Sequence, residues 1–243
     1  MLLTLGGSIA VASAGFGFVI VLVGTLQFFM STAELVGVVT TLNCVLMFLR
    51  VIETRKIGNW SLTTHLIIPS FFSIPLGVAV LKYLDPLLMR RFLNLVILVG
   101  AFTMAYSLYS NHRLLLKLRA DRKRKINTHI AGFMSGFMIG SCSMGASPLV
   151  IWGILEDLRK IEMHAVWARF FFSAFLFSFI NLNLNGLYNS PTVLLSFFLI
   201  PAVLVGFRIG IWIRNRISEE RFRFFVLVFL SLSGLAGFAV SFK

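Results

Sequence analysis

The stretch Ser141-Cys142-Ser143-Met144-Gly145-Ala146-Ser147-Pro148 interrupts one apolar segment, and Gly15-Phe16-Gly17 interrupts another near the start of the chain. A membrane helix that is broken in this way exposes backbone N–H groups to hydrocarbon, where each unsatisfied group costs several kcal/mol. Such breaks are tolerated where they are buried in protein or line a wet cavity, and paired breaks in two repeats point to a transporter's binding site. The two stretches therefore predict a membrane protein with a polar site at mid-depth.

The composition supports a membrane location. Hydrophobic residues make up 58% of the chain and charged residues 13%, and this charged share is about half that of a soluble domain. Apolar runs of roughly 20 residues recur, and each is long enough to cross about 30 Å of hydrocarbon. A transmembrane barrel is excluded because it needs short alternating segments. We predict an all-α, multi-pass protein without a cleaved signal peptide, because no basic region precedes the first apolar run.

Eight apolar segments are expected, and the first segment of each half is broken. They cover residues 3–29 (broken at 15–17), 33–50, 63–82, 88–110, 129–155 (broken at 140–147), 163–185, 192–213 and 220–241. We interpret residues 1–110 and 129–243 as two homologous repeats that are joined by a basic linker, 111–128.

Short matches between the halves indicate a duplication. They are Gly17 with Gly145, Ala33-Glu34 with Ile161-Glu162, Pro69 with Pro201, and 89–92 with 222–225, at offsets that rise only from 128 to 133 residues.

The distribution of basic residues favours inverted repeats. If all eight segments span the membrane, Lys and Arg divide almost evenly between the two sides and the positive-inside rule gives no orientation. If the two broken segments are re-entrant, each half has three spans, and 16 of the 22 Lys and Arg residues lie on one side with four on the other. We therefore predict inverted halves, a cytoplasmic linker and two non-cytoplasmic termini.

Several partner classes are not expected. The net charge of +13 comes mainly from loop residues, which suits anionic lipid headgroups better than nucleic acid. The four histidines lie near membrane edges without ligand spacing, so no metal site is predicted. No phosphate-binding Gly-x₄-Gly-Lys-[Ser/Thr] motif is present, and no ATP site or other cofactor is expected.

The second break carries the residue types that an anion site needs. Pro148 suits a first helical position, so a helix that begins at Ser147 or Pro148 would aim its free N–H groups and positive end at the membrane centre. Serine hydroxyls would add donors, and glycines would let a ligand approach the backbone. The predicted substrate-binding residues of the two breaks are Gly15, Gly17, Ser141, Ser143, Gly145 and Ser147. The alternative interpretation is that these small residues serve close helix packing.

Arg169 is a further substrate-binding candidate because it lies about two turns inside an apolar segment, where a cation is costly without a partner or a cavity. Its guanidinium can bind two oxygens of an oxyanion. Alternatively, it reaches the interface and contacts a lipid phosphate or Glu162.

Other polar residues are candidates for ion coupling or for a polar path. Glu34 and Glu162 occupy equivalent repeat positions, although Ser31-Thr32-Ala33-Glu34 also has the pattern of a helix capping box. The possible path residues are Thr40, Thr41, Asn43, Asn181 and Asn183. Such residues also commonly bond neighbouring helices.

At these residues the chain resembles the sulfite exporter TauE/SafE family of membrane anion transporters. The resemblance rests on the Gly-rich break of each half, Gly15-Phe16-Gly17 and Ser143-Met144-Gly145-Ala146-Ser147-Pro148, and on Pro201-Ala202-Val203-Leu204-Val205-Gly206-Phe207-Arg208-Ile209-Gly210 with the basic turn that follows. The Gly-x-Gly-Gly-Gly pattern of the family is thinned at both breaks. The resemblance implies transport of sulfite, organosulfonates or other sulfur anions.

We therefore predict a secondary transporter of a small anion that works by alternating access in the plasma membrane of a bacterium or archaeon, with a homo-oligomer left open. An intramembrane enzyme with Ser141 or Ser143 as nucleophile is one alternative, but it lacks an evident base. A thiol carrier that uses Cys44 and Cys142 is the other, but the two cysteines are far apart in sequence and lack a Cys-x-x-Cys motif.

Overall fold

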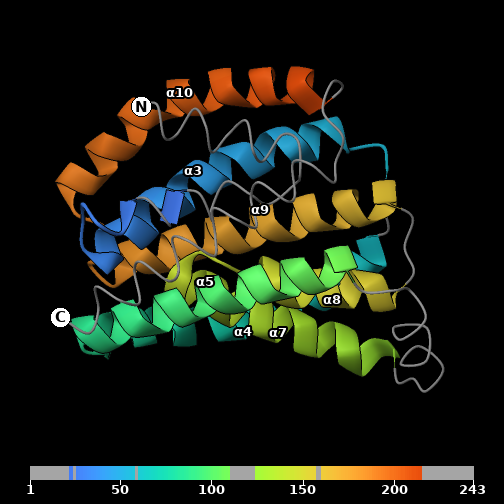
Figure 1. Cartoon of the computed structure of the whole chain (residues 1–243), viewed down its shortest axis with the longest axis horizontal. Helices are drawn as coiled ribbons and strands as arrows, with labels where there is room; N and C mark the ends of the chain where they lie inside the picture. Colours follow the sequence, from blue (N-terminus) through green and yellow to red (C-terminus); the bar gives the residue numbers. More distant parts are fainter. Residues whose placement is uncertain (1–21, 24–25, 58–59, 110–123, 157–159, 215–243) are drawn as a thin grey trace.

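The computed structural model describes residues 22–23, 26–57, 60–109, 124–156 and 160–214, and these contain seven α-helices and no strand. The helices lie roughly along one direction, as Figure 1 shows. They are α3 (Thr32–Glu53), α4 (Trp60–Tyr83), α5 (Pro86–Tyr109), α7 (Arg124–Cys142), α8 (Ala146–Leu155), α9 (Lys160–Leu184) and α10 (Ser190–Arg214). The all-helical prediction is confirmed for this part of the chain. The first break, with Gly15 and Gly17, and the predicted segment 220–241 lie outside the described residues.

The helices follow the predicted apolar segments closely. Within the described ranges, α3, α4 and α9 are long and apolar enough to cross a membrane, and α10 contributes a shorter apolar stretch over Thr192–Gly206. Large apolar side chains lie on the outside of the bundle, among them Phe72, Phe102 and Phe198, where lipid is the matching solvent. α7 begins at Arg124, inside the stretch that the sequence predicts as linker.

Two helix starts show how the sequence sets the boundaries. At α3, Ser31 and Glu34 form the predicted capping box, with the Ser31 N–H donating to the Glu34 carboxylate at 3.0 Å. At α5, the Asp85 carboxylate accepts from the backbone N–H groups of Leu87 at 2.9 Å and Leu88 at 3.2 Å. Both carboxylates satisfy amides that the first turn of a helix leaves without partners.

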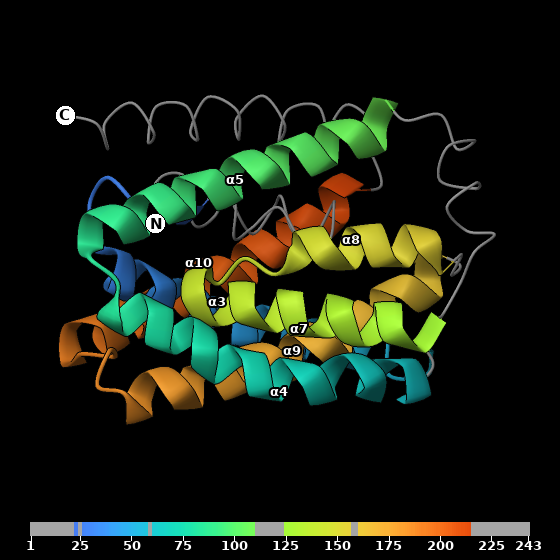
Figure 2. The same cartoon turned by 90° about the horizontal axis from the view of Figure 1, so that it is seen from below.

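The most extensive contact among the described helices joins α4 and α7, which run parallel (Figure 2). Glycines let the two backbones touch: a Cβ atom at Gly132 would lie 2.9 Å from the Leu66 Cα atom, and one at Gly136 would lie 2.7 Å from the Ser70 Cα atom. Since helix association in lipid depends on close packing and not on hydrophobic exclusion, small residues are expected at such an interface. The α4–α7 pair is therefore a tightly fixed unit that joins the two halves of the sequence.

α7 and α8 form an antiparallel hairpin around the second break. Trp152, near the end of α8, donates from its indole N–H to the Thr128 hydroxyl near the start of α7, at 3.0 Å. At the other end of the hairpin, Gly145 packs against Ser135 and Ile139 of α7. The far ends of both helices therefore lie at the same end of the bundle, as Figure 2 also shows.

The remaining helices of the two halves interleave. α3 and α9 run antiparallel, with Phe48 and Phe172 in ring contact at a centroid distance of 5.6 Å. α4 packs on α9, where the rings of Phe71 and Phe177 lie 4.6 Å apart, and α10 packs on α3. Each half thus completes its packing against helices of the other half.

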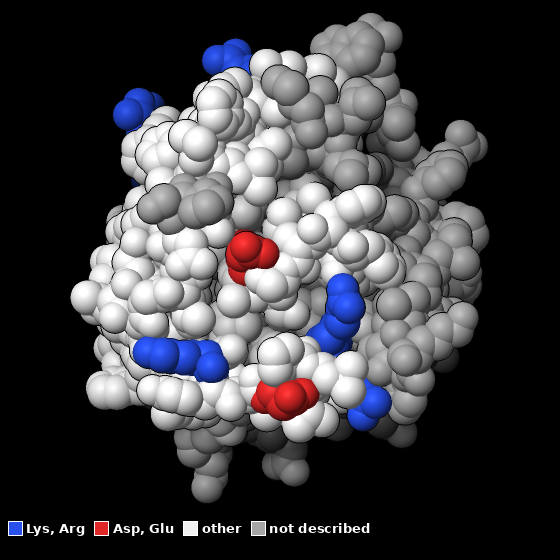
Figure 3. Space-filling model, turned by 90° about the vertical axis from the view of Figure 1, so that its left-hand side faces the viewer, with Lys and Arg blue, Asp and Glu red and all other residues white. Residues whose placement is uncertain are grey.

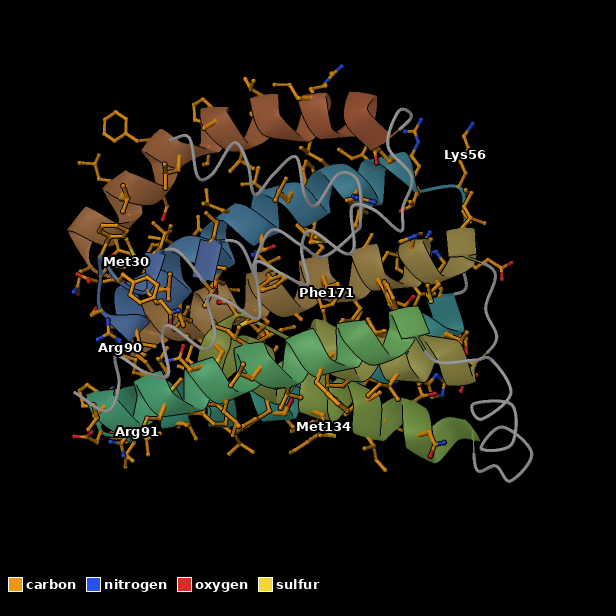
Figure 4. The ribbon with its side chains drawn as sticks, viewed as in Figure 1. Met30, Lys56, Arg90, Arg91, Met134 and Phe171 are labelled. Carbon is orange, nitrogen blue, oxygen red and sulfur yellow. The ribbon has the colours of Figure 1, made fainter. Side chains whose placement is uncertain are left out.

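Charged side chains gather at the ends of the bundle. In Figure 4, Lys56 lies at the end where α3 finishes, and Arg90 and Arg91 lie at the opposite end, where α5 begins. Figure 3 views that opposite end and shows only a few charged side chains, of both signs, on a largely uncharged surface. This arrangement leaves an apolar middle that matches the hydrocarbon of a bilayer.

Candidate functional site

The second break is a three-residue turn, 143–145, between α7 and α8. Its first residue, Ser143, has a φ angle of 57° and is the one non-glycine with positive φ among the described residues. The amides of Ser143 and Met144 donate to the carbonyls of Ile139 at 2.9 Å and Met138 at 3.2 Å. These bonds satisfy carbonyls at the end of α7, the role that a left-handed residue normally plays after a helix.

α3 meets this turn through hydroxyl groups. The Ser143 hydroxyl lies 2.6 Å from the Thr40 hydroxyl and donates to the Val36 carbonyl at 3.1 Å. Because the Ser143 proton goes to Val36, Thr40 must supply the proton between the two hydroxyls. Thr40 and Ser143 are both fully buried. The contact is therefore a closed polar link between the two halves of the sequence.

The predicted serine donors are largely committed to the protein itself. Ser141 donates to the Phe137 carbonyl at 2.9 Å, and Ser135 donates to the Gly145 carbonyl. Ser143 donates to the Val36 carbonyl. The hydroxyl protons of Ser135, Ser141 and Ser143 are therefore all used in bonds to backbone carbonyls, and only the oxygen lone pairs remain free. Ser147, in the first turn of α8, is half-buried.

Gly145 is needed for packing within the hairpin. A Cβ atom at this position would lie 2.6 Å from a side-chain carbon of Ile139 and 2.7 Å from the Ser135 carbonyl oxygen. The space that the missing side chain leaves is thus filled by α7. This close contact is what the packing interpretation of the sequence predicts for Gly145.

The start of α8 keeps its free donors. The helix begins at Ala146, one residue before the earliest predicted start, and its N-cap residue Gly145 makes no side-chain cap. Pro148 therefore occupies the third position of the helix, where a missing N–H is tolerated as well as at the first. No acidic residue lies in the first turn. The positive end of α8 is therefore half-buried at the break, and its N-cap residue provides no capping side chain.

Asn43 lies on the face of α3 that contacts the break. Val36 and Thr40 contact Ser143, and Asn43 follows Thr40 by three residues, so it shares their face of α3. Its side-chain N–H donates to the Val39 carbonyl at 2.8 Å. Its Oδ1 atom has no hydrogen-bond partner among the described residues, although Asn43 is only 1% exposed.

Thr41 points to a different neighbour. Its hydroxyl lies 2.5 Å from the Tyr188 hydroxyl, which in turn donates to Ser196 of α10 at 3.2 Å. The two predicted path residues Thr41 and Asn43 thus lie on different faces of α3, and only Asn43 shares the face of the break. Asn181 and Asn183 of α9 each donate to the carbonyl four residues earlier, at 2.9 and 2.8 Å.

The guanidinium of Arg169 does not bond to the break. One of its terminal nitrogens donates to the carbonyls of Thr54, Arg55 and Ile57 in the α3–α4 turn, and its guanidinium carbon lies 4.4 Å from the Trp60 ring centroid. Thr54 follows Thr40 by 14 residues, a helical rise of about 21 Å. The cation therefore holds the C-terminal end of α3, where the helix dipole favours positive charge.

The two predicted coupling carboxylates both lie in first turns of helices. Glu34 accepts from Ser31 in the capping box of α3, including from the Ser31 hydroxyl at 2.7 Å. Glu162 lies in the first turn of α9 and is half-buried. Acidic groups at these positions complement the positive ends of their helices. Glu34 thus belongs to the cap of α3 and not to the second break.

The cysteines are free thiols on two different helices, Cys44 on α3 and Cys142 at the end of α7. In the described ranges, no three His, Cys, Asp or Glu side chains lie together as a metal-binding group.

Sequence reasoning missed the glycine contact of α4 with α7, the role of Ser135, and Asn94 of α5. Asn94 is fully buried, and within the described part of the chain neither its side-chain nitrogen nor its oxygen has a hydrogen-bond partner. The sequence signal that could have identified Asn94 is its position as a polar residue among the apolar residues of α5.

A bundle of apolar helices around a buried, broken helix defines the class of helical membrane proteins. The family model described as sulfite exporter TauE/SafE matches residues 1–237 of the 243-residue chain. The chain therefore belongs to the TauE/SafE family and is a membrane transport protein. Comparison with curated proteins and with solved structures gives no significant match.

Proposed function

We propose that this protein is a secondary transporter that carries a small anion across the cell membrane, and that the second break forms part of its binding site. The proposed substrates are sulfur oxyanions, such as sulfite or an organosulfonate. Of these, the family description names sulfite. The observation that carries the proposal is the start of α8, where buried Gly145 makes no side-chain cap and the first three residues of the helix are half-buried. Such a helix end attracts anions through its free amides and its positive dipole end.

The position of the break supports this assignment. Ser143 contacts Thr40, which lies eight residues after the first residue of α3, a rise of about 12 Å along a helix that spans a bilayer. A capping side chain would satisfy the amides of α8 permanently, and the described N-cap residue, Gly145, provides none. An anion that enters and leaves can satisfy them instead.

The two halves are proposed to be inverted repeats with re-entrant hairpins. The antiparallel course of α7 and α8 supports a hairpin that returns to the side from which it entered. The antiparallel pair α3 and α9 supports inversion, since these helices occupy equivalent places in the repeat. Under that equivalence α4 matches α10, so the contact of α4 with α9 corresponds to that of α10 with α3.

Alternating access is proposed to involve α3 and the break. α3 makes few contacts with α7, and the Thr40–Ser143 bond joins α3 to the turn that follows α7. By contrast, the α4–α7 backbone contact cannot slide without steric overlap, because the glycines leave no spare space. We infer that α4 and α7 move as one unit and that α3 separates from the break to admit the anion.

The enzyme and thiol-carrier alternatives gain no support from specific contacts. The Ser143 hydroxyl bonds to a threonine hydroxyl and a carbonyl, and Ser141 bonds to a carbonyl. Neither type of group is a general base. Cys142 is fully buried among core residues, and a buried apolar site disfavours the reactive thiolate.

Flux measurements in proteoliposomes test the proposed function. Purified full-length protein would be reconstituted and assayed for uptake of sulfite, methanesulfonate, thiosulfate and acetate, with empty liposomes as the control. We expect saturable flux of at least one sulfur oxyanion and none of acetate. Saturable acetate flux without any response to sulfur anions would replace the substrate class, and no flux of any anion would contradict transport.

A further inference from the structure

The hydrogen-bond pattern at the second break is mixed, and this limits the ligand that it can hold. Free donors come from the first amides of α8, which have no side-chain cap. Free acceptors come from α3, where Asn43 Oδ1 has no partner and where the Thr40 oxygen keeps a lone pair after its proton goes to Ser143. A fully deprotonated oxyanion can accept from the amides, but it can only repel the Asn43 oxygen.

The orientation of the Asn43 oxygen is fixed by the other half of its amide group. The side-chain nitrogen donates to the Val39 carbonyl at 2.8 Å, so the oxygen must point away from that carbonyl. The Asn43 side chain is 99% buried and belongs to the face of α3 that contacts Ser143. A buried acceptor without a partner costs about 1–3 kcal/mol, so this oxygen needs a donor that the described protein does not supply.

From this pattern we propose that the break binds a monoanion that keeps one acidic O–H group, namely hydrogen sulfite in preference to the sulfite dianion or an alkanesulfonate. The inference rests on the proposed function. The anionic oxygens accept from the α8 amides, and the ligand O–H donates to Asn43 Oδ1. No proton changes owner in this binding step. One helix end carries about half a positive charge, which suits one negative charge better than two.

Ionisable side chains of the helices at the break do not supply a second positive charge to this site. None of them makes a hydrogen bond to Thr40, Asn43 or Ser143 among the described residues. Those with described side chains are Glu34, Arg50 and Glu53 on α3, Arg90 and Arg91 on α5, and His129 on α7, and the described part of α8 has none. The thiols Cys44 and Cys142 complete the set. The pH dependence of binding should therefore follow the ligand.

Asn94 supplies a second buried amide that has no hydrogen-bond partner among the described residues. It lies on α5, which packs against α8 and contacts α3. Its side chain is fully buried, and its nitrogen and oxygen both lack partners. An amide can donate to one oxygen of a protonated oxyanion and accept from its O–H. This residue therefore fits the same kind of ligand, although the proposal depends on Asn43.

The test measures sulfite transport and competition at several pH values in proteoliposomes of the full chain. For the unmodified protein, we expect the KM expressed as hydrogen sulfite to stay constant while the KM for total sulfite rises with pH. Methanesulfonate, a monoanion without an O–H group, should compete about tenfold more weakly than hydrogen sulfite, the effect of losing one hydrogen bond to a charged ligand.

Asn43→Leu removes the acceptor and should abolish the difference between hydrogen sulfite and methanesulfonate. Asn183→Leu is the matched control, because Asn183 makes the same bond to the carbonyl four residues earlier but is exposed; it should keep the tenfold preference. If Asn43→Leu does not fold, the pH and competition data on the unmodified chain still decide the matter.

The outcomes separate the two proposals. Saturable sulfite flux that follows the dianion, or equal competition by methanesulfonate, would overturn the hydrogen sulfite inference and leave anion transport intact. Absence of saturable flux for any anion would contradict the proposed function itself.

Discussion

The hairpin α7–α8 has two neighbours that contact it in opposite ways. α4 meets α7 backbone to backbone, through Gly132, Gly136 and Gly140, with no room for a methyl group. α3 meets the same hairpin through the hydroxyls of Thr40 and Ser143, with little other contact. The first interface is rigid because repulsion opposes any shift, whereas the second is held by hydrogen bonds that water or a ligand can replace. We call the rigid α4–α7 pair the frame of the protein, and we call the Thr40–Ser143 contact between α3 and the break its moving contact.

The largest expected effect comes from breaking the frame. Gly132→Ala would place a methyl group 2.9 Å from the Leu66 Cα atom and closer still to the Leu66 carbonyl oxygen. We expect a loss of about 3 kcal/mol of stability, since a backbone neighbour cannot move aside. Thermal unfolding in detergent, followed by size-exclusion chromatography, measures this.

Gly153→Ala is the control for this substitution. A methyl group there would meet the Met163 sulfur at 2.7 Å, which belongs to a flexible side chain that can shift. The melting temperature should change much less than in Gly132→Ala. Equal effects in the two variants would show that the α4–α7 contact is not special.

Arg169→Gln tests whether this cation belongs to the frame or to the site. The substitution removes the donors that hold the carbonyls of Thr54, Arg55 and Ile57, so we expect about 2 kcal/mol of lost stability. The KM of the folded fraction should remain unchanged, and Arg169→Lys should restore part of the stability. A KM raised tenfold or more at normal stability would instead place Arg169 in the substrate site.

Thr40→Val addresses the moving contact. The substitution keeps the shape of the side chain but removes the bond to Ser143, so the link between α3 and the break is lost. We expect transport to fall about tenfold, with a stability change of about 1 kcal/mol. Thr41→Val removes a neighbouring hydroxyl that faces Tyr188 and should leave transport close to normal. Similar transport in both variants would argue against the moving contact.

Ser143→Gly should have the smallest effect on stability. Glycine relieves the strain of a φ angle of 57°, which gains about 0.5–1 kcal/mol, whereas loss of the bonds to Thr40 and Val36 costs a similar amount. We expect nearly unchanged thermal stability with reduced transport. A variant that is much less stable would mean that the hydroxyl belongs to the frame.

Local patterns predicted the local structure well. The apolar segments gave the described helices because length and hydropathy determine membrane spans, and Ser31 and Glu34 gave the start of α3 because capping is a contact within one turn. The break between α7 and α8 followed from its glycine, serine and proline residues. These features depend only on neighbours in sequence.

Contacts between distant segments could not be predicted in the same way. Nothing local shows that Ser143 would give its proton to Val36 or that Thr40 would be its partner, because both contacts depend on how α3 packs. Arg169 is similar: the sequence showed a cation in an apolar helix, but its carbonyl partners lie in a turn more than a hundred residues earlier. The spacing of Gly132, Gly136 and Gly140 was a readable signal of close helix packing.

The most direct test of the central claim is to locate a bound anion. Selenite, a heavier relative of sulfite, can be identified by its anomalous scattering in crystals of the full-length protein grown with the anion. We expect a selenium peak at the start of α8, within hydrogen-bond distance of the first amides of the helix and close to Asn43. A peak beside Arg169 instead, or a start of α8 that stays empty while selenite is transported, would contradict it.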